Sequence, residues 1–236
     1  MPHPAPTVHA QGVDHLVVFA RWPEPGQVKT RLSPALPPEL AAAFYEAMVR
    51  DTIETGRLAS VDRRYLYWLG APPDRPWSRA AREAGYRETL QRGSDLGTRL
   101  EAAFEELLSG PGEHVVVVGT DAPELSPALI AAAFARLASH DLVLGPTLDG
   151  GYYLVGLGRR APEIFHGIPW GTDQVLARTL ERAGGAGLTT ALLDPLSDVD
   201  VPADLVQLMI RCLAAGAEAP THTAGALREL GLLPGP

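Results

Sequence analysis

The first loop after an apolar run carries the one lysine of the chain. Residues 20–32 read ARWPEPGQVKTRL, and Lys29 is the only lysine among 20 Lys and Arg residues. A Walker A loop needs glycine before its lysine so that backbone N–H groups can wrap phosphates, but valine precedes this one. What remains is a stiff turn bending at Gly26, with the cations Arg21, Lys29 and Arg31. A lysine ammonium is a compact point charge that suits phosphate oxygens, so the loop predicts a phosphate contact. A solvated basic loop is the alternative.

A carboxylate follows the most apolar run of the sequence. The run HVVVV leads into GTDAPEL, which places Asp121 where a buried strand ends. A lone carboxylate at such a position is a natural ligand for Mg²⁺ or Mn²⁺, which take oxygen ligands and pair with substrate phosphates. Capping of the next helix is the alternative, but Ser126 followed by proline already provides an N-cap there. Metal binding is therefore the preferred interpretation of Asp121.

Two further acidic segments end apolar runs. Asp149 is followed by Gly150 and Gly151, which would let a ligand approach the backbone closely, although an Asp-Gly hairpin turn fits equally well. The segment LSDVD places Asp198 and Asp200 after the last apolar run. They could complete a metal site or cap the following helix. Capping is the favoured reading of Asp200, and Asp198 is left open. With the cationic loop, these carboxylates suit a nucleotide phosphate held by a metal.

Short β-rich runs alternate with helical patterns along the chain. Strands are expected at residues 15–20, 64–69, 86–91, 114–119, 141–146, 152–157 and 188–193. Helices are expected at residues 37–56, 80–85, 96–110, 127–140, 172–185, 201–216 and 224–231. This alternation predicts an α/β fold with a mostly parallel sheet and helices on both faces. Ligands of such sheets bind at the carboxyl ends of the strands, where the polar loops fall.

Composition restricts the class of partner. The net charge of −8 argues against a nucleic-acid or anionic-membrane partner. One cysteine excludes an internal disulfide, and no Cys/His pattern resembles a zinc site. The first residues lack a signal-peptide pattern, and no apolar run is long enough to span a bilayer. A cytoplasmic location is the default expectation, and the oligomeric state stays open.

Several motifs in one order carry a family resemblance. They are FARWPEPGQVKTRL, GSDLGTRL, GTDAPEL, LGPTLDGGYYLVGL, PWGTDQVL and DVDVPADL, between about residues 15 and 205. The sequence resembles a bacterial family of GT-A-type glycosyltransferases, found near radical-SAM genes and linked to arsenosugar biosynthesis. It is also similar to 2-phospho-lactate guanylyltransferases and, more distantly, to molybdenum-cofactor nucleotidylyltransferases. The G-x-G-x-R loop of sugar nucleotidylyltransferases is absent, so their phosphate contacts are not carried over.

The resemblance implies a GT-A fold, Rossmann-like, in a domain spanning residues 15–215. Residues 1–14 would be an N-terminal extension, and residues 216–236 a tail with a possible short helix. The implied catalytic residues are Lys29, Asp121 and Asp149, and the implied metal ligands are Asp121, Asp198 and Asp200. The implied nucleotide contacts are Arg21, Gly26, Lys29, Arg31, Gln91, Leu96, Gly97 and Thr120, with Gln91, Leu96 and Gly97 at the base and Arg99 structural. The implied acceptor side comprises Gly150, Gly151, Tyr152, Trp170, Thr172 and Asp173.

The expected activity is transfer of a group from a nucleotide donor, with Mg²⁺ or Mn²⁺ as the cofactor. Sugar transfer from a nucleotide-diphosphate sugar to a small-molecule acceptor is the main hypothesis. Its rival is nucleotidyl transfer from an NTP to a small phosphorylated or carboxylated acceptor, with release of pyrophosphate. The dense positive loop favours the rival, and the family naming favours sugar transfer. A nucleotide-sensing module without catalysis is a third possibility, against which Asp121 and Asp149 argue.

Overall fold

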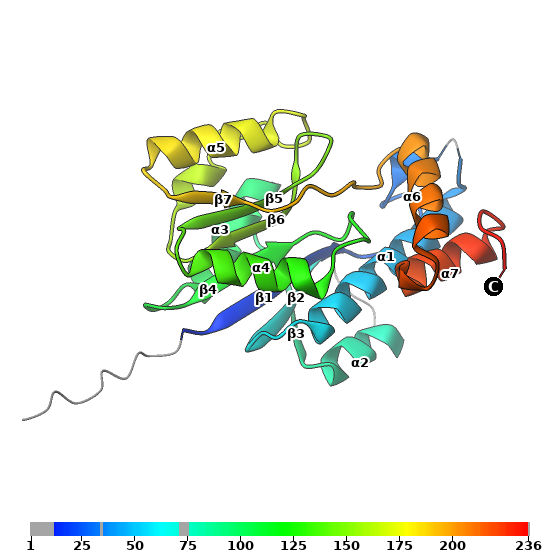
Figure 1. The fold of residues 1–236 in the computed structure, drawn as a ribbon, viewed down its shortest axis with the longest axis horizontal. Coiled ribbons are helices and arrows are strands. Elements are labelled where there is room, and N and C mark those ends of the chain that lie inside the picture. The colour runs from blue at the N-terminus through cyan, green and yellow to red at the C-terminus, as the bar shows by residue number, and fades with distance from the viewer. Residues whose placement is uncertain (1–11, 34, 71–75, 236) are drawn as a thin grey trace, which may run out of the picture.

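The computed structural model of this chain describes residues 12–33, 35–70 and 76–235. Its centre is a seven-stranded sheet with the strand order β3-β2-β1-β4-β6-β5-β7 (Figure 1). The strands are β1 (Asp14–Arg21), β2 (Arg63–Leu69), β3 (Tyr86–Leu90), β4 (His114–Val118), β5 (Leu142–Pro146), β6 (Tyr152–Leu157) and β7 (Thr190–Leu192). The pairs among β1, β2, β3 and β4 and the β5–β7 pair are parallel. Only β6 runs antiparallel to its neighbours, β4 and β5. The predicted mostly parallel α/β fold is confirmed.

Helices cover both faces of this sheet (Figure 1). They are α1 (Pro38–Leu58), α2 (Pro76–Glu83), α3 (Leu96–Leu107), α4 (Pro127–Leu137), α5 (Val175–Gly185), α6 (Pro202–Ala215) and α7 (Thr221–Glu229), with short 3₁₀ turns at Thr30–Leu32, Pro162–Phe165 and Gly216–Glu218. Alternate residues of β1 and β4 point to opposite faces, as the two-residue period of a strand requires. One set packs with α1, α4, α6 and α7, and the other set packs with α3 and α5.

Local sequence signals fix several helix boundaries. Ser126 is the N-cap of α4, its side chain accepts a hydrogen bond from the backbone of Leu129, and proline follows it, as predicted. Asp95 caps α3 and forms a capping box with Thr98. These caps lie at the carboxyl edge of the sheet, so they also fix where the loops of that edge begin.

The C-terminal tail packs on the main body of the protein. Helix α7 lies against α1 (Figure 1), with Ala224 and Leu227 buried in the shared core. The buried carboxylate of Asp51, in α1, accepts hydrogen bonds from the backbone N–H groups of His222 and Thr223 at the start of α7. No helix among the described residues is long and apolar enough to cross a membrane. Most of the predicted N-terminal extension, residues 1–11, lies outside the described residues.

Candidate active site

The loops at the carboxyl ends of β1, β4 and β5 meet at one edge of the sheet. The loop after β1 carries Lys29, the loop after β4 carries Asp121, and the turn after β5 carries Asp149. Because β1, β4 and β5 run in the same direction, these loops emerge on the same side. The sequence interpretation grouped these residues, and the fold brings them together.

Lys29 lies between two carboxylates rather than in solvent. Its Nζ forms ion pairs with Asp121 and, at 2.8 Å, with Asp200, and its side chain is only 5% exposed. Burial disfavours the charged ammonium, but the negative charges of Asp121 and Asp200 outweigh it and raise the pKa of Lys29. Lys29 is also the only non-glycine residue of the described chain with a positive φ, at 47°. A left-handed backbone costs a side-chain-bearing residue energy and is characteristic of functional loops.

A tyrosine that the sequence analysis missed supports this lysine. Tyr45, in α1, accepts a hydrogen bond from the backbone N–H of Arg21 at 2.9 Å, and its hydroxyl pairs with Thr120 at 2.8 Å. Lys29 Nζ lies 5.9 Å from the centre of the Tyr45 ring. Burial raises the pKa of Tyr45 to about 12, so the phenol remains neutral. In the sequence this tyrosine is indistinguishable from a core aromatic on the buried face of α1.

The segment after β7 crosses the edge of the sheet and delivers two more carboxylates. It reaches the loop after β4 because the backbone N–H of Val199 donates to the carbonyl of Asp121 at 3.0 Å. Asp200 pairs with Lys29 and lies 3.8 Å from an Arg31 nitrogen. The prediction that Asp200 caps α6 is wrong, because the N-cap residue is Val201. The Asp204 side chain, in the first turn of the helix, accepts from the backbone N–H groups of residues 200 and 201.

The sequence left two alternatives for the turn after β5, a ligand-facing turn or a simple hairpin turn, and the structure combines them. It is a hairpin turn between antiparallel β5 and β6, and it also faces the site. Asp149 Oδ1 accepts hydrogen bonds from Thr147 Oγ1 at 2.5 Å and from the backbone N–H of Gly151 at 3.0 Å. A Cβ atom at Gly150 would lie 2.1 Å from the Asp173 carbonyl oxygen, so this position requires glycine.

Two adjoining cavities open at this edge, and they differ in charge. Among the described residues, the cationic cavity, of about 410 Å³, is lined by Arg21, Lys29, Arg31 and Arg99, with Asp121 and Asp200 as its only carboxylates. The acidic cavity, of about 290 Å³, is lined by Asp121, Asp149, Asp198 and Asp200, with Arg31 as the only cation that the described part of the chain gives it. Asp121 and Asp200 line both, so they form part of the wall that the cavities share.

Most residues predicted to contact the nucleotide line the cationic cavity. Six of the eight do so: Arg21, Lys29, Arg31, Gln91, Leu96 and Thr120. Gln91 Nε2 donates to the carbonyls of Ala20, at 3.1 Å, and Tyr67, at 2.9 Å. Gly26 bends an exposed turn outside the cavity. Gly97 is buried beneath Trp170, where a Cβ would lie 2.7 Å from the indole nitrogen, so its position serves packing.

Arg99 joins this cavity as well. It donates to the carbonyls of Gly93 and Ser94, both at 3.1 Å, and thereby braces the loop before α3, as its predicted structural role requires. It also lines the cationic cavity. The arginine therefore combines a structural contact with a place in the site.

Some of the predicted acceptor residues line the acidic cavity, and others only pack nearby. Gly151, Tyr152, Trp170 and Thr172 line the acidic cavity. Gly150 and Asp173 do not line it and pack against each other through their backbones. Tyr152 meets Trp170 edge to face, with ring centres 6.2 Å apart. The acceptor assignment of these residues stays a prediction.

The three predicted metal ligands, Asp121, Asp198 and Asp200, outnumber the buried cation beside them, Lys29. Burial, together with the negative charges of Asp149 and Asp200, raises the pKa of Asp198 to about 7. No three His, Cys, Asp or Glu side chains of the described residues are arranged to hold a metal ion. The Lys29 ammonium lies between two of the three predicted ligands. Asp121 and Asp200, which share this ammonium, are the pair of oxygen donors that a divalent cation could use, and the ammonium is a competing charge.

Comparisons with known proteins agree with this architecture. The chain is 28% identical over 191 residues to a 2-phospho-L-lactate guanylyltransferase from Halorubrum lacusprofundi, covering 80% of this chain and 82% of that protein. A crystal structure from Desulfovibrio desulfuricans G20, provisionally named a nucleotide-diphospho-sugar transferase, has 30% identity and a TM-score of 0.81. That match covers 94% of this chain and 96% of the other.

A more distant structure shares the fold alone. Glucosyl-3-phosphoglycerate synthase from Mycobacterium tuberculosis, solved with Mn²⁺ and UDP, has 15% identity and a TM-score of 0.51, over 95% of this chain and 81% of that one. The GT-A type of fold is confirmed, and so is an enzyme of the transferase class.

The family comparison completes this assignment. The family DUF2064, described as an uncharacterized protein conserved in bacteria, matches residues 52–172. These residues include the loop before α3, Asp121, the turn after β5 and Trp170. The chain belongs to the DUF2064 family.

Proposed function

We propose that this protein transfers a glycosyl group from a nucleotide-diphosphate sugar to a hydroxyl group of a small acceptor, with a divalent cation. The observation that carries the proposal is the pair of adjoining cavities of opposite charge, which share Asp121 and Asp200. A cationic cavity suits the diphosphate of a donor. The acidic cavity beside it suits a molecule that brings hydroxyl groups, and the shared carboxylates lie where the two substrates would meet.

Donor binding is assigned to the cationic cavity. Arg21, Arg31 and Arg99 present guanidinium groups suited to phosphate oxygens. Lys29 would join them once a phosphate draws its ammonium away from the carboxylates. At the far end of the cavity, both Nε2 hydrogens of Gln91 point to backbone carbonyls. Its Oε1 is then the atom left to accept a hydrogen bond from a nucleobase.

Asp121 and Asp200 are the residues assigned to the cation. Asp198, the third predicted ligand, is left out because no three such side chains of the described residues are arranged to hold a metal ion. When bound, a divalent cation would neutralise the charge that develops on the leaving diphosphate. The Lys29 ammonium already stabilises that pair of carboxylates, which supports their role as a cation site. Displacement of this ammonium by donor phosphates would couple donor binding to cation binding.

Asp149 is assigned to the acceptor. Its Oδ1 is held by two hydrogen bonds, while its Oδ2 accepts none from the described residues. In the transfer step the acceptor oxygen forms a bond to the anomeric carbon. The bond from that carbon to the diphosphate oxygen breaks, and its electron pair stays with the diphosphate. The hydroxyl proton passes to the Asp149 carboxylate, which acts as the general base.

Nucleotidyl transfer is the second candidate, and two observations favour it. The Halorubrum relative is named a guanylyltransferase, and four cations are more than a diphosphate needs. In that reaction an acceptor oxygen would bond to the α-phosphorus, and pyrophosphate would leave with the electron pair of the broken bond.

The products separate the two reactions. The purified protein is incubated with Mn²⁺ and a panel of UDP-, GDP-, CDP- and ADP-sugars, and in parallel with the four NTPs, each with a mixture of sugars, polyols and hydroxy acids. Release of an NDP with a glycosylated product supports the proposal. Pyrophosphate release from an NTP means nucleotidyl transfer. Nucleotide binding without turnover in either series means a sensing module.

A further inference from the structure

The acidic cavity has the wrong charge for a phosphorylated or carboxylated acceptor. The described residues of its lining include four aspartates and one cation, Arg31, whose side chain is 71% exposed and also lines the cationic cavity. Lys29 does not line this cavity, but its ammonium pairs with two of the four aspartates, Asp121 and Asp200, from the cationic side. A divalent cation would offset two of the four negative charges, which leaves the cavity without surplus positive charge for an anionic group. An anion placed there would meet like charges, which is how sites reject a wrong ligand.

The polar atoms of this cavity are mostly hydrogen-bond acceptors. The Asp149 carboxylate is held in one orientation by Thr147 and Gly151, with Oδ2 left for a ligand. Asp198 is half-buried in the same wall. Acceptors of this kind need donors on the ligand, and hydroxyl groups are neutral donors of this kind.

The same cavity also has an aromatic surface in its lining. Trp170 lines the cavity beside Tyr152, with the two rings nearly perpendicular, at 83°. The indole is held from behind by the close approach of Gly97, where any side chain would collide with it. An aromatic ring held in this way packs against the apolar C–H face of a ring or polyol. Carboxylates and an aromatic ring in the lining of one cavity match a polyhydroxylated ligand.

We infer that the acceptor is an uncharged polyhydroxylated molecule, a sugar or polyol without phosphate or carboxylate groups, bound between Asp149 and Trp170. This inference rests on the proposed function, because it assigns the acidic cavity to the acceptor. It distinguishes this chain from its Halorubrum relative, which is named for a phosphorylated substrate.

Matched pairs of ligands test the inference by binding, without any turnover. Saturation-transfer NMR on the full chain with Mg²⁺ would compare methyl glucoside with glucose 6-phosphate and glucuronate, and glycerol with glycerol 3-phosphate and glycerate. The uncharged member of each pair is expected to bind more tightly. Asp149→Asn and Trp170→Leu are expected to weaken its binding about tenfold, the cost of one hydrogen bond to a charged acceptor or of one aromatic contact.

Controls make the outcome decisive. Glu39→Gln changes a carboxylate on the exposed start of α1 and should leave binding unchanged. Trp170→Phe keeps an aromatic face and should retain more binding than Trp170→Leu. Tighter binding of the charged members, or no binding of the uncharged ones, overturns the inference. Calorimetry with UDP, GDP, CDP and ADP, run on the same samples, tests the proposed function separately, because failure of the donor site would abolish nucleotide binding.

Discussion

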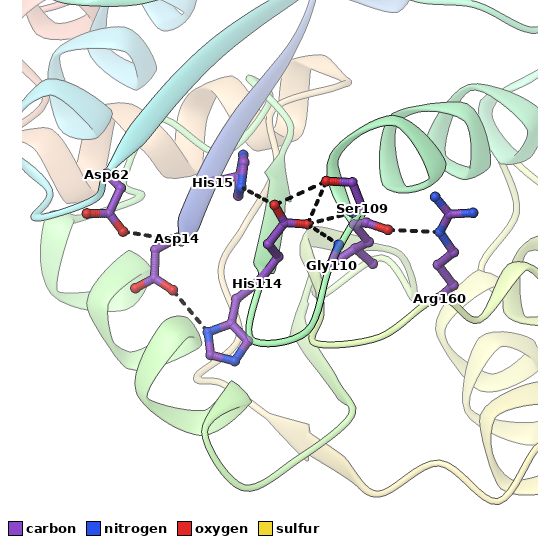
Figure 2. A network of polar contacts seen from close by, with 9 residues as sticks. Asp14, His15, Asp62, Ser109, Gly110, His114 and Arg160 are labelled. Carbon is purple, nitrogen blue, oxygen red and sulfur yellow. Dashed lines mark hydrogen bonds and ion pairs between the residues drawn. The ribbon is translucent and has the colours of Figure 1, made fainter. Parts of the chain in front are cut away.

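The two edges of the central sheet use the same residue types in opposite ways. At the amino edge, Figure 2 shows the carboxylate of Asp14 beside His114, at 3.0 Å, and the N–H groups of Ser109 and Gly110 directed at one carboxylate. That carboxylate belongs to Glu113, directly before β4. At the carboxyl edge, Asp149, Asp198 and Asp200 line one cavity together. The amino edge supplies each of its carboxylates with donors, whereas the carboxyl edge gathers carboxylates around too few cations.

The pKa shifts follow this difference. Burial opposes ionisation of Glu113, but the backbone N–H groups of Gly110 and Ser109 outweigh it and lower the pKa. Asp141, before β5, accepts from the backbone N–H and hydroxyl of Thr189 and from Arg159, which together lower its pKa to about 2. At the carboxyl edge, by contrast, burial and the neighbouring carboxylates raise the pKa of Asp198. Carboxylates satisfied by the protein stabilise the fold, and carboxylates left without donors are available to a ligand.

The largest effect is expected at the carboxyl edge, where Asp121→Asn removes a charge but little volume. We expect the transfer rate to fall by about 10²–10³, the usual loss when one charge-stabilising group is removed from an active site. The stability should change little, because the side chain of Asp121 is 53% exposed. Turnover, nucleotide calorimetry with Mn²⁺ and thermal unfolding measure the three quantities. Normal turnover in the variant would remove Asp121 from the site.

Lys29→Met tests whether the ammonium competes with a metal. Without the ammonium, Asp121 and Asp200 lose their shared counter-ion. The nucleotide-free variant should therefore bind Mn²⁺ about tenfold more tightly, a gain of about 1.4 kcal/mol in binding free energy. Free Mn²⁺ measured by EPR during a titration gives both affinities. Arg31→Met is the matched control, because this exposed arginine lies 3.8 Å from Asp200 and should matter less. Equal Mn²⁺ affinity in the wild type and Lys29→Met would mean that these carboxylates do not hold the cation.

Much of this edge could be predicted from the sequence, because strand ends of a parallel sheet must meet. The order of the elements sufficed to group Lys29, Asp121 and Asp149. The ion pair between Asp200 and Lys29 could not be predicted, since it depends on one backbone hydrogen bond, from Val199 to the Asp121 carbonyl, that joins segments far apart in the chain. Tyr45 was missed for a related reason: its position on a helix marks it as core, and only tertiary packing turns its hydroxyl toward Thr120.

Asp141→Asn, at the amino edge, should have the opposite effect to Asp121→Asn: it should lower the stability and leave the active site unchanged. Loss of a charged acceptor for Thr189 and Arg159 should lower the free energy of unfolding by about 1 kcal/mol near neutral pH. Because the folded pKa lies below the unfolded one, this contribution is present above about pH 4 and is lost as the pH falls toward 2. Denaturant unfolding at several pH values gives the difference between wild type and variant.

Nucleotide binding completes that test. Asp141→Asn should bind nucleotide as the wild type does, since Asp141 lines neither cavity. Weakened nucleotide binding together with unchanged stability would contradict the view that carboxylates stabilise the fold at the amino edge and bind ligands at the carboxyl edge.

The smallest effect is expected from His15, which is buried at the amino edge beside β2 and β4. Its ring stacks on Tyr65 at 5.8 Å, and its Nε2 lies 3.9 Å from Glu113. Burial lowers the pKa of His15, and Arg63 adds to this, while Glu113, Asp14 and Asp62 oppose it. A histidine whose folded pKa lies below its unfolded value loses stability as the pH falls through about 6.5. His15→Leu should therefore flatten the decline in the free energy of unfolding between about pH 7 and 5, by less than about 1 kcal/mol. His140→Gln, at the surface, should leave that slope as it is. A wild-type slope retained in His15→Leu would show that the buried imidazole is not the group that takes up a proton in this pH range.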